Sequence, residues 1–92
     1  MGNTITLLDM AQNLLVLDRE LTIYAAKPWT PESAAILAEQ DDKPGYSTAP
    51  KGGMAYFIEV FIAQGFLEEW VKEGRPAREI CERLIHYAIY DA

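Results

Sequence analysis

Residues 27–42, KPWTPESAAILAEQDD, decide whether this chain folds as an all-α or an α+β protein. Threonine followed by proline, as in Thr30-Pro31, is a common start of a helix, and the alanines and leucine that follow favour helical backbone. A helix here would last only about ten residues before the acidic and proline-containing stretch from residue 41 ends it, and so short a helix depends on packing for its stability. Local preference therefore favours a helix only slightly.

The residues before this stretch predict one helix and one strand. Thr6 and Asp9 have the spacing of a capping box, and the apolar residues that follow lie on one side at helical spacing, which predicts a helix over residues 6–17. Leu21-Thr22-Ile23-Tyr24-Ala25 alternates and contains residues typical of strands, so it predicts a strand that Pro28 ends.

The residues after this stretch begin with a loop. Residues 41–53 contain several prolines and glycines, and this predicts a loop long enough to be functional. The β-branched and aromatic content of residues 55–61 then favours a strand. Tyr56, Val60, Ala63, Leu67 and Trp70 also have the spacing of one helical face, so a single helix over residues 54–73 remains an alternative.

The C-terminal third predicts two helices. An apolar stripe from Phe66 to Val71 is followed by Gly74, which is placed to end a helix, and Pro76 suits the first turn of the next one. Residues 77–88 then place their apolar side chains at helical spacing without a break. We expect the two helices to form an antiparallel hairpin.

The size and charge of the chain limit the classes of function that it can have. The chain has 92 residues, enough for one domain spanning residues 1–92, and its net charge is −6. Lysine and arginine are scattered, so we expect no nucleic acid as a partner, whereas a basic protein would be attracted. We find no signal peptide, no stretch long enough to span a membrane and only one cysteine, and we therefore expect a cytoplasmic protein that binds no membrane.

The residues that carry chemistry do not form a recognisable catalytic set. Cys81 and His86, each the only residue of its kind, are five positions apart on the last predicted helix and project about 140° from each other. One histidine and one cysteine are too few for a zinc site, and the acidic residues 39–42 lack the pattern of a calcium loop. We expect no metal, no cofactor and no enzymatic activity, although a weak hydrolase that relies on carboxylates remains an alternative.

Several short motifs occur in a fixed order along most of the chain. They are Leu21-Thr22-Ile23-Tyr24, Trp29-Thr30-Pro31-Glu32-Ser33, Ala35-Ile36-Leu37, the acids of residues 39–42, Gly53-Met54-Ala55-Tyr56-Phe57-Ile58-Glu59-Val60 and Tyr87-Ala88-Ile89-Tyr90-Asp91-Ala92. Together they resemble a family of small bacterial proteins, the domain of unknown function 7716. The resemblance implies a small α+β domain in which residues 34–39 are extended and Thr30-Pro31-Glu32 is a bend. It also implies a role as an immunity protein beside a bacterial toxin, which is the role ascribed to some such proteins.

With this resemblance, we predict an α+β fold: an N-terminal helix, three short antiparallel strands, and a helical hairpin packed on the sheet. The strands are residues 21–25, 34–39 and 55–61, and an all-α fold remains the alternative.

The predicted function is binding to a protein partner, as an immunity factor or another inhibitor. Aromatic side chains beside acidic ones are typical interface anchors, so we predict partner-binding residues at Trp29, Glu39, Asp41, Asp42 and Tyr46. The alternative is a small-molecule-binding or regulatory module whose pocket is lined by Tyr46, Tyr56 and Trp70. A homodimer is also compatible with so apolar a short chain.

Overall fold

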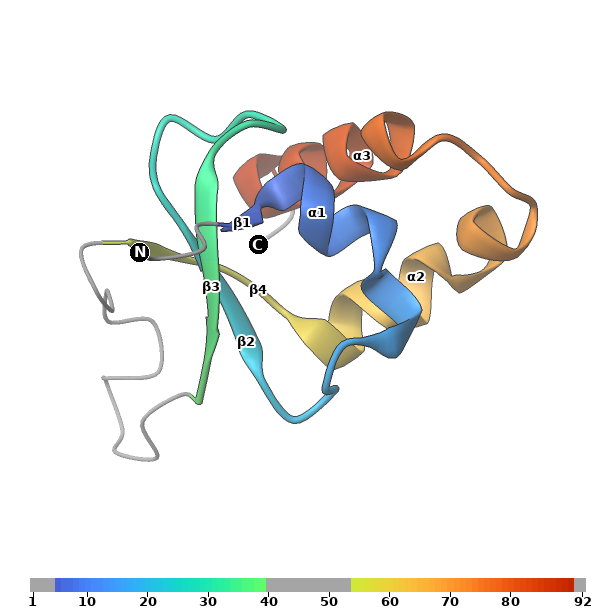
Figure 1. Cartoon of the computed structure of the whole chain (residues 1–92), viewed down its shortest axis with the longest axis horizontal. Helices are drawn as coiled ribbons and strands as arrows, with labels where there is room; N and C mark the ends of the chain where they lie inside the picture. The colour runs from blue at the N-terminus through green and yellow to red at the C-terminus, as the bar shows by residue number, and fades with distance from the viewer. Residues whose placement is uncertain (1–4, 40–53, 91–92) are drawn as a thin grey trace.

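The fold is α+β, as predicted, with the helices on one side of a four-stranded antiparallel sheet (Figure 1). The computed structural model of the chain describes residues 5–39 and 54–90. The sheet has the order β1-β3-β2-β4. Along the chain, the elements are β1 (Ile5–Thr6), α1 (Leu7–Gln12), the 3-10 turn η1 (Leu14–Val16), β2 (Thr22–Ala25), β3 (Ala34–Ala38), β4 (Ala55–Glu59), α2 (Val60–Lys72) and α3 (Ala77–Tyr90).

Residues 34–38 form a strand. This confirms the strand predicted for residues 34–39, although the local sequence slightly favours a helix there. β3 pairs with β2 over four residue pairs and with β1 on its other side, so it is an interior strand. Ala35 is buried beneath the helices, where a small side chain allows close packing. β2 pairs along Ala35–Ala38 and β1 pairs with Ala34 and Ala35, and this tertiary context overrides the helix preference of the alanines.

The bend before β3 is held by side-chain hydrogen bonds. The Ser33 hydroxyl accepts a bond from the Thr30 amide at 2.8 Å and donates to the Pro28 carbonyl at 2.9 Å. The Lys27–Pro28 peptide bond is cis. Thr30-Pro31-Glu32 is therefore a bend, as predicted, and the amide of Ala26 bonds across it to the carbonyl of Ala34.

Three predicted element boundaries were wrong. The sheet contains a fourth strand, β1, which was not predicted, and its second residue, Thr6, was expected to begin the first helix. That helix ends at Gln12 rather than residue 17, and η1 follows it, although the predicted capping box between Thr6 and Asp9 is confirmed. Residues 55–73 are neither one strand to residue 61 nor one helix, because β4 passes directly into α2 at Val60.

The core lies between the sheet and the three helices. α1 makes its most extensive helix packing with α3, so the first and last helices of the fold are neighbours. α2 and α3 follow each other as predicted, joined by Gly74, whose positive φ of 80° ends α2. Core side chains from every layer are Leu7, Met10, Leu14, Ile23, Phe57, Val60, Leu67, Ile80, Cys81 and Leu84.

The opposite face of the sheet carries two tyrosines. Tyr24 alternates with the core residues Ile23 and Ala25, so its ring points away from the helices, and it meets Tyr56 edge to face at 6.2 Å. In the described ranges 5–39 and 54–90, no helix has the length and apolar character that crossing a bilayer requires.

Candidate functional site

The turn η1 exposes two apolar side chains, those of Leu15 and Val16. A 3-10 turn has about three residues per turn, so only one of its three side chains faces the core. Leu14 takes that position, whereas Leu15 is 37% exposed and Val16 is 82% exposed. Exposed aliphatic side chains side by side on a protein surface favour contact with another molecule.

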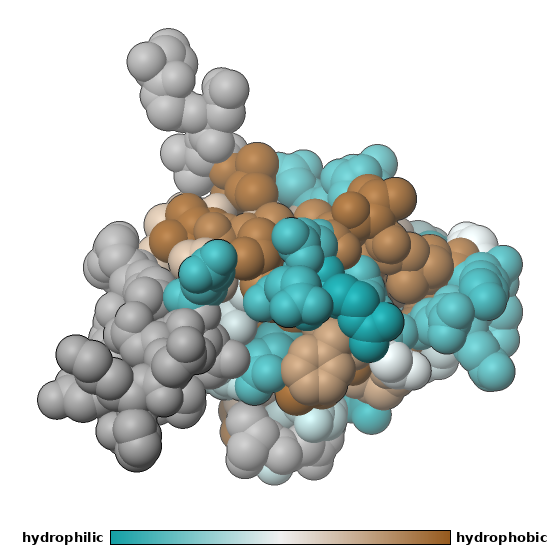
Figure 2. Space-filling model, turned by 90° about the horizontal axis from the view of Figure 1, so that it is seen from below, coloured by the Kyte–Doolittle hydropathy of each residue, from teal (hydrophilic) through white to brown (hydrophobic). Residues whose placement is uncertain are grey.

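The first turn of α2 adds an aromatic ring to the same region. Phe61 is 46% exposed, although its neighbours Val60 and Ile62 pack against the core. Leu15, Phe61 and Gly65 line one hollow of about 350 Å³, together with Arg19, Gln64 and Glu68. Figure 2 shows the molecule from below, where apolar and hydrophilic side chains adjoin on the surface. We give the name η1–α2 face to the surface formed by residues that line this hollow or the one adjoining it, and by Val16, the exposed residue next to Leu15 in η1; its residues are Leu15, Val16, Arg19, Glu20, Glu59, Phe61, Gln64, Gly65 and Glu68.

One side chain fastens the two halves of this face together. The amide Nε2 of Gln64 donates to the carbonyls of Leu14 and Leu17, each at 3.0 Å. These bonds join α2 to a turn about fifty positions earlier in the chain. The exposed side chains of η1 are therefore held in a fixed position relative to Phe61, and such preorganisation lowers the entropic cost of binding.

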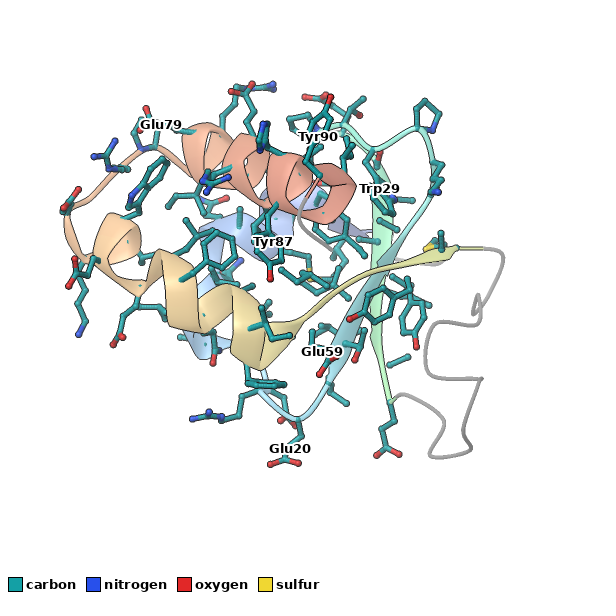
Figure 3. The ribbon with its side chains drawn as sticks, turned by 180° about the vertical axis from the view of Figure 1, so that it is seen from behind. Glu20, Trp29, Glu59, Glu79, Tyr87 and Tyr90 are labelled. Atoms are coloured by element: carbon teal, nitrogen blue, oxygen red, sulfur yellow. The ribbon has the colours of Figure 1, made fainter. Side chains whose placement is uncertain are left out.

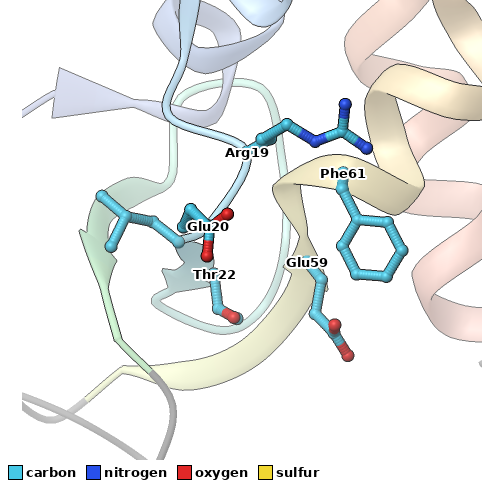
Figure 4. A pocket seen from close by; sticks show the side chains of 6 residues that line it. Arg19, Glu20, Thr22, Glu59 and Phe61 are labelled. Carbon is cyan, nitrogen blue, oxygen red and sulfur yellow. The ribbon is translucent and has the colours of Figure 1, made fainter.

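A second, more polar hollow adjoins the first. Its volume is about 280 Å³, and Arg19 and Phe61 line both hollows. In Figure 4 the side chains of Glu20, Thr22 and Glu59 lie around it, with the ring of Phe61 beside Glu59. The sheet fixes this geometry, because Thr22 and Glu59 are paired residues of β2 and β4, and the Val60 amide bonds to the Leu21 carbonyl at 3.0 Å.

Glu59 also connects the polar hollow to the tyrosine pair. The Tyr56 hydroxyl donates to Oε2 of Glu59 at 3.1 Å. Burial, followed by the negative charge of Glu59, raises the pKa of Tyr56 to about 12. Tyr56 is therefore a neutral hydrogen-bond donor at physiological pH, and it orients the Glu59 carboxylate.

Of the predicted partner-binding residues, the structure describes Trp29 and Glu39, and it places them at opposite ends of the sheet. Trp29 follows the far end of β2 and is half-buried: its indole N–H donates to the Ala25 carbonyl at 3.2 Å, and its ring meets Phe57 edge to face at 4.9 Å. Glu39 is exposed just after β3, whose last residue pairs with Thr22, so Glu39 lies at the end of the sheet that carries the polar hollow. Asp41, Asp42 and Tyr46 lie outside the described residues. The roles proposed for all five stay predictions.

A third hollow lies beside Trp29, away from the η1–α2 face. It has a volume of about 360 Å³ and is lined by Lys27, Pro28, Trp29, Ala88 and Ile89. Tyr90 lies near this end of α3, beside the region of Trp29 in Figure 3, and is largely exposed. Trp29 thus contributes to the core and to a surface at the same time.

The alternative pocket of Tyr46, Tyr56 and Trp70 is not assembled by the described residues. Tyr56 lies with Tyr24 on the sheet face away from the helices. Trp70 packs against the core from α2, and the Arg75 guanidinium lies 4.2 Å from the centre of its ring. The two aromatic side chains are therefore on different sides of the sheet.

Cys81 and His86 do not converge either. Cys81 is buried in the core, and burial raises the pKa of its thiol to about 12. His86 is exposed on α3, where its ring lies 4.7 Å from that of Tyr90. Within residues 5–39 and 54–90, no three His, Cys, Asp or Glu side chains are grouped in a way that would hold a metal ion.

Sequence reasoning missed most of the η1–α2 face, although a signal for it was present. Four apolar residues in a row, Leu14-Leu15-Val16-Leu17, exceed what one side of a helix buries, so some must be exposed or the helix must end.

No protein-family model matches the chain, and neither the curated proteins nor the solved structures contain a match.

Proposed function

We propose that this protein acts by binding another protein through the η1–α2 face. The observation that carries the proposal is the exposure of Leu15 and Val16 on η1 and of Phe61 on α2, two elements that Gln64 joins by hydrogen bonds. Protein interfaces combine an apolar centre with a polar rim, and Arg19, Glu20, Glu59 and Glu68 supply such a rim here.

The resemblance to the domain of unknown function 7716 supports a more specific version of this proposal. An immunity factor or inhibitor blocks its target by occupying a surface, so it needs a rigid, complementary face and no catalytic group. The chemistry of the described residues is compatible with this mode of action, since Cys81 is buried in the core and His86 is exposed on α3, where the two side chains do not converge. The cytoplasm of a bacterium is the proposed setting.

Site-directed photo-crosslinking tests this proposal. A photoreactive phenylalanine analogue replaces Val16 in one variant and Glu79 in a control variant, and both are expressed in the native host. Val16 lies on η1, whereas Glu79 is in the first turn of α3, at the other end of the molecule from Glu20 and Glu59 in Figure 3. We expect a protein to be crosslinked at position 16 and not at position 79.

The affinity of the purified partner for variants of the chain then tests whether the η1–α2 face is the binding surface. Replacing an exposed apolar anchor by a charged residue removes a central contact, so Val16→Asp should weaken binding by about tenfold or more, which corresponds to about 1.4 kcal/mol. If Val16→Asp and Phe61→Ser both bind that partner as the parent chain does, the η1–α2 face is not the binding surface.

A further inference from the structure

We infer that the occupant of the η1–α2 face is a positively charged, amphipathic segment of the partner protein. Its apolar side chains would contact Leu15 and Phe61, and its lysine or arginine side chains would lie beside Glu20 and Glu59. This inference rests on the proposed function and adds the chemistry of the partner.

The division of the face into two adjoining hollows is the first argument. One hollow has Leu15, Phe61 and Gly65 in its walls beside Arg19, Gln64 and Glu68, and a Cβ added at Gly65 would meet no atom within 4 Å, so an apolar side chain has room there. The other hollow is lined by Glu20 and Glu59. Since Arg19 and Phe61 line both, an occupant that fills both hollows would place an apolar and a charged side chain close together.

The charge of the face is the second argument. Asp18, Glu20, Glu59 and Glu68 place four carboxylates on or beside it, against the guanidinium of Arg19 and the ammonium of Lys72, which pairs with Glu68 at 3.0 Å. Four negative charges and two positive ones leave −2 on the face, and the whole chain carries −6. Opposite charge raises the rate of association and selects partners, so a basic segment is favoured.

The exposed ring of Phe61 is the third argument. It lies beside Glu59 at the boundary of the two hollows (Figure 4). A cation gains energy from contact with an aromatic ring as well as from a carboxylate, and an arginine or lysine stem also packs on such a ring. The same ring therefore suits both kinds of side chain in the occupant.

Charge argues against the other occupants. A second copy of the chain would bring another face with a net charge of −2 against the first, and like charges oppose such pairing. Nucleic acids and anionic lipid surfaces are repelled for the same reason.

The test uses a designed peptide and matched charge variants. The probe is a blocked peptide of about 14 residues, four helical turns, with leucines on one face and lysines on the other, and its counterpart carries glutamate in place of lysine. Binding is measured by isothermal titration and by amide chemical shifts at two salt concentrations. The double variant Glu20→Gln with Glu59→Gln is compared with Glu79→Gln with Glu82→Gln on α3, which has the same net charge.

We expect the lysine peptide to shift the amides of η1 and the first turn of α2, and the glutamate peptide to shift none. The Glu20/Glu59 double variant should bind the lysine peptide about tenfold more weakly than the parent chain, and the Glu79/Glu82 variant should lose less than about threefold. Equal weakening in both variants would mean general attraction to an acidic protein and would overturn the inference. So would a concentration-dependent dimer that Val16→Asp dissociates, because a second copy would then cover the face.

Binding of the native partner separates this inference from the proposed function. If Val16→Asp loses that partner and the Glu20/Glu59 double variant keeps it, the face binds protein but the inferred partner chemistry is wrong. If neither change weakens binding, the proposed function itself is wrong.

Discussion

Replacing Gln64 by methionine should destabilise the fold and loosen η1. Methionine has a similar length and keeps the apolar contacts of the side chain, but it cannot donate a hydrogen bond. The change therefore removes the bonds to the carbonyls of Leu14 and Leu17, each 3.0 Å long, and little else.

The structure sets the expected magnitude. A hydrogen bond contributes about 0.5–1.5 kcal/mol net, so two contribute about 1–3 kcal/mol. The Leu14 carbonyl also accepts from the Leu17 amide at 3.3 Å, so it keeps one partner when Gln64 is replaced. We therefore expect a loss of about 1–2 kcal/mol in the free energy of unfolding, which corresponds to a fall of about 5–15 °C in Tm for a chain of this size.

Thermal unfolding and hydrogen exchange measure the two consequences. The amides of Val16 and Leu17, which bond within the turn to Asn13 and Leu14, should exchange faster in the Gln64→Met variant while core amides of β2 change in proportion to global stability. Gln12→Met, at the exposed end of α1, is the control and should leave Tm unchanged within about 2 °C. A Gln64→Met protein with the parent Tm and parent exchange rates in η1 would refute the role given to this side chain.

Three further sets of substitutions test other parts of the fold by thermal or urea unfolding. Gly65→Ala should stabilise the protein by about 0.5–1 kcal/mol, because the position is helical and a Cβ has open space there. Gly74→Ala should destabilise it by about 1–2 kcal/mol, because alanine is strained at a φ of 80°. If the two substitutions shift Tm in the same direction, this reasoning is wrong. Trp29→Phe should lower the free energy of unfolding by about 1 kcal/mol, because the hydrogen bond to the Ala25 carbonyl is lost. Trp29→Ala should lower it by about 3 kcal/mol, because the ring contact with Phe57 is lost as well. Equal stability of these two variants would show that the ring does not support the core. The pKa of Tyr56 is raised from 10.0 to about 12 in the folded protein, so its contribution to stability is complete below pH 10 and is lost as pH rises toward 12. In a Cys81→Ala background, which removes a thiol whose pKa is also raised to about 12, Tyr56→Phe should flatten the alkaline decline of the urea midpoint, and an unchanged slope would exclude this cause.

The sequence predicted most of the elements because their signals are local, whereas the choice of an α+β fold over an all-α fold depended on the family resemblance. The capping box of Thr6 and Asp9, the strand that became β2 and the two C-terminal helices with Gly74 between them were all confirmed. β3 was predicted through the family resemblance, since its alanines favour helix and only pairing with β1 and β2 makes it a strand. β1 was missed because two residues carry no periodicity, and only the pairing of Ile5 with Ala35 defines it.

The candidate site was less predictable for a physical reason. Trp29 was predicted from its type and its prolines, but nothing in the sequence reveals that its N–H reaches the Ala25 carbonyl and its ring reaches Phe57. The η1–α2 face joins residues 15–20 to residues 59–68, and this juxtaposition follows from the end of α1 at Gln12 and the bonds of Gln64. Periodicity describes one element at a time, so it cannot place two distant segments beside each other.

The packing of α1 against α3 has a consequence for how the protein is made. The ribosome synthesises α1 before its main helical neighbour α3, so Leu7 and Met10 complete their core contacts only after residues 77–90 have been made. Such distant pairing slows folding, because a large loop must close before the contact forms. Nascent chains arrested before residue 77 should therefore be protease-sensitive and bind chaperones, and protection should arise only once residues 77–90 have left the ribosome.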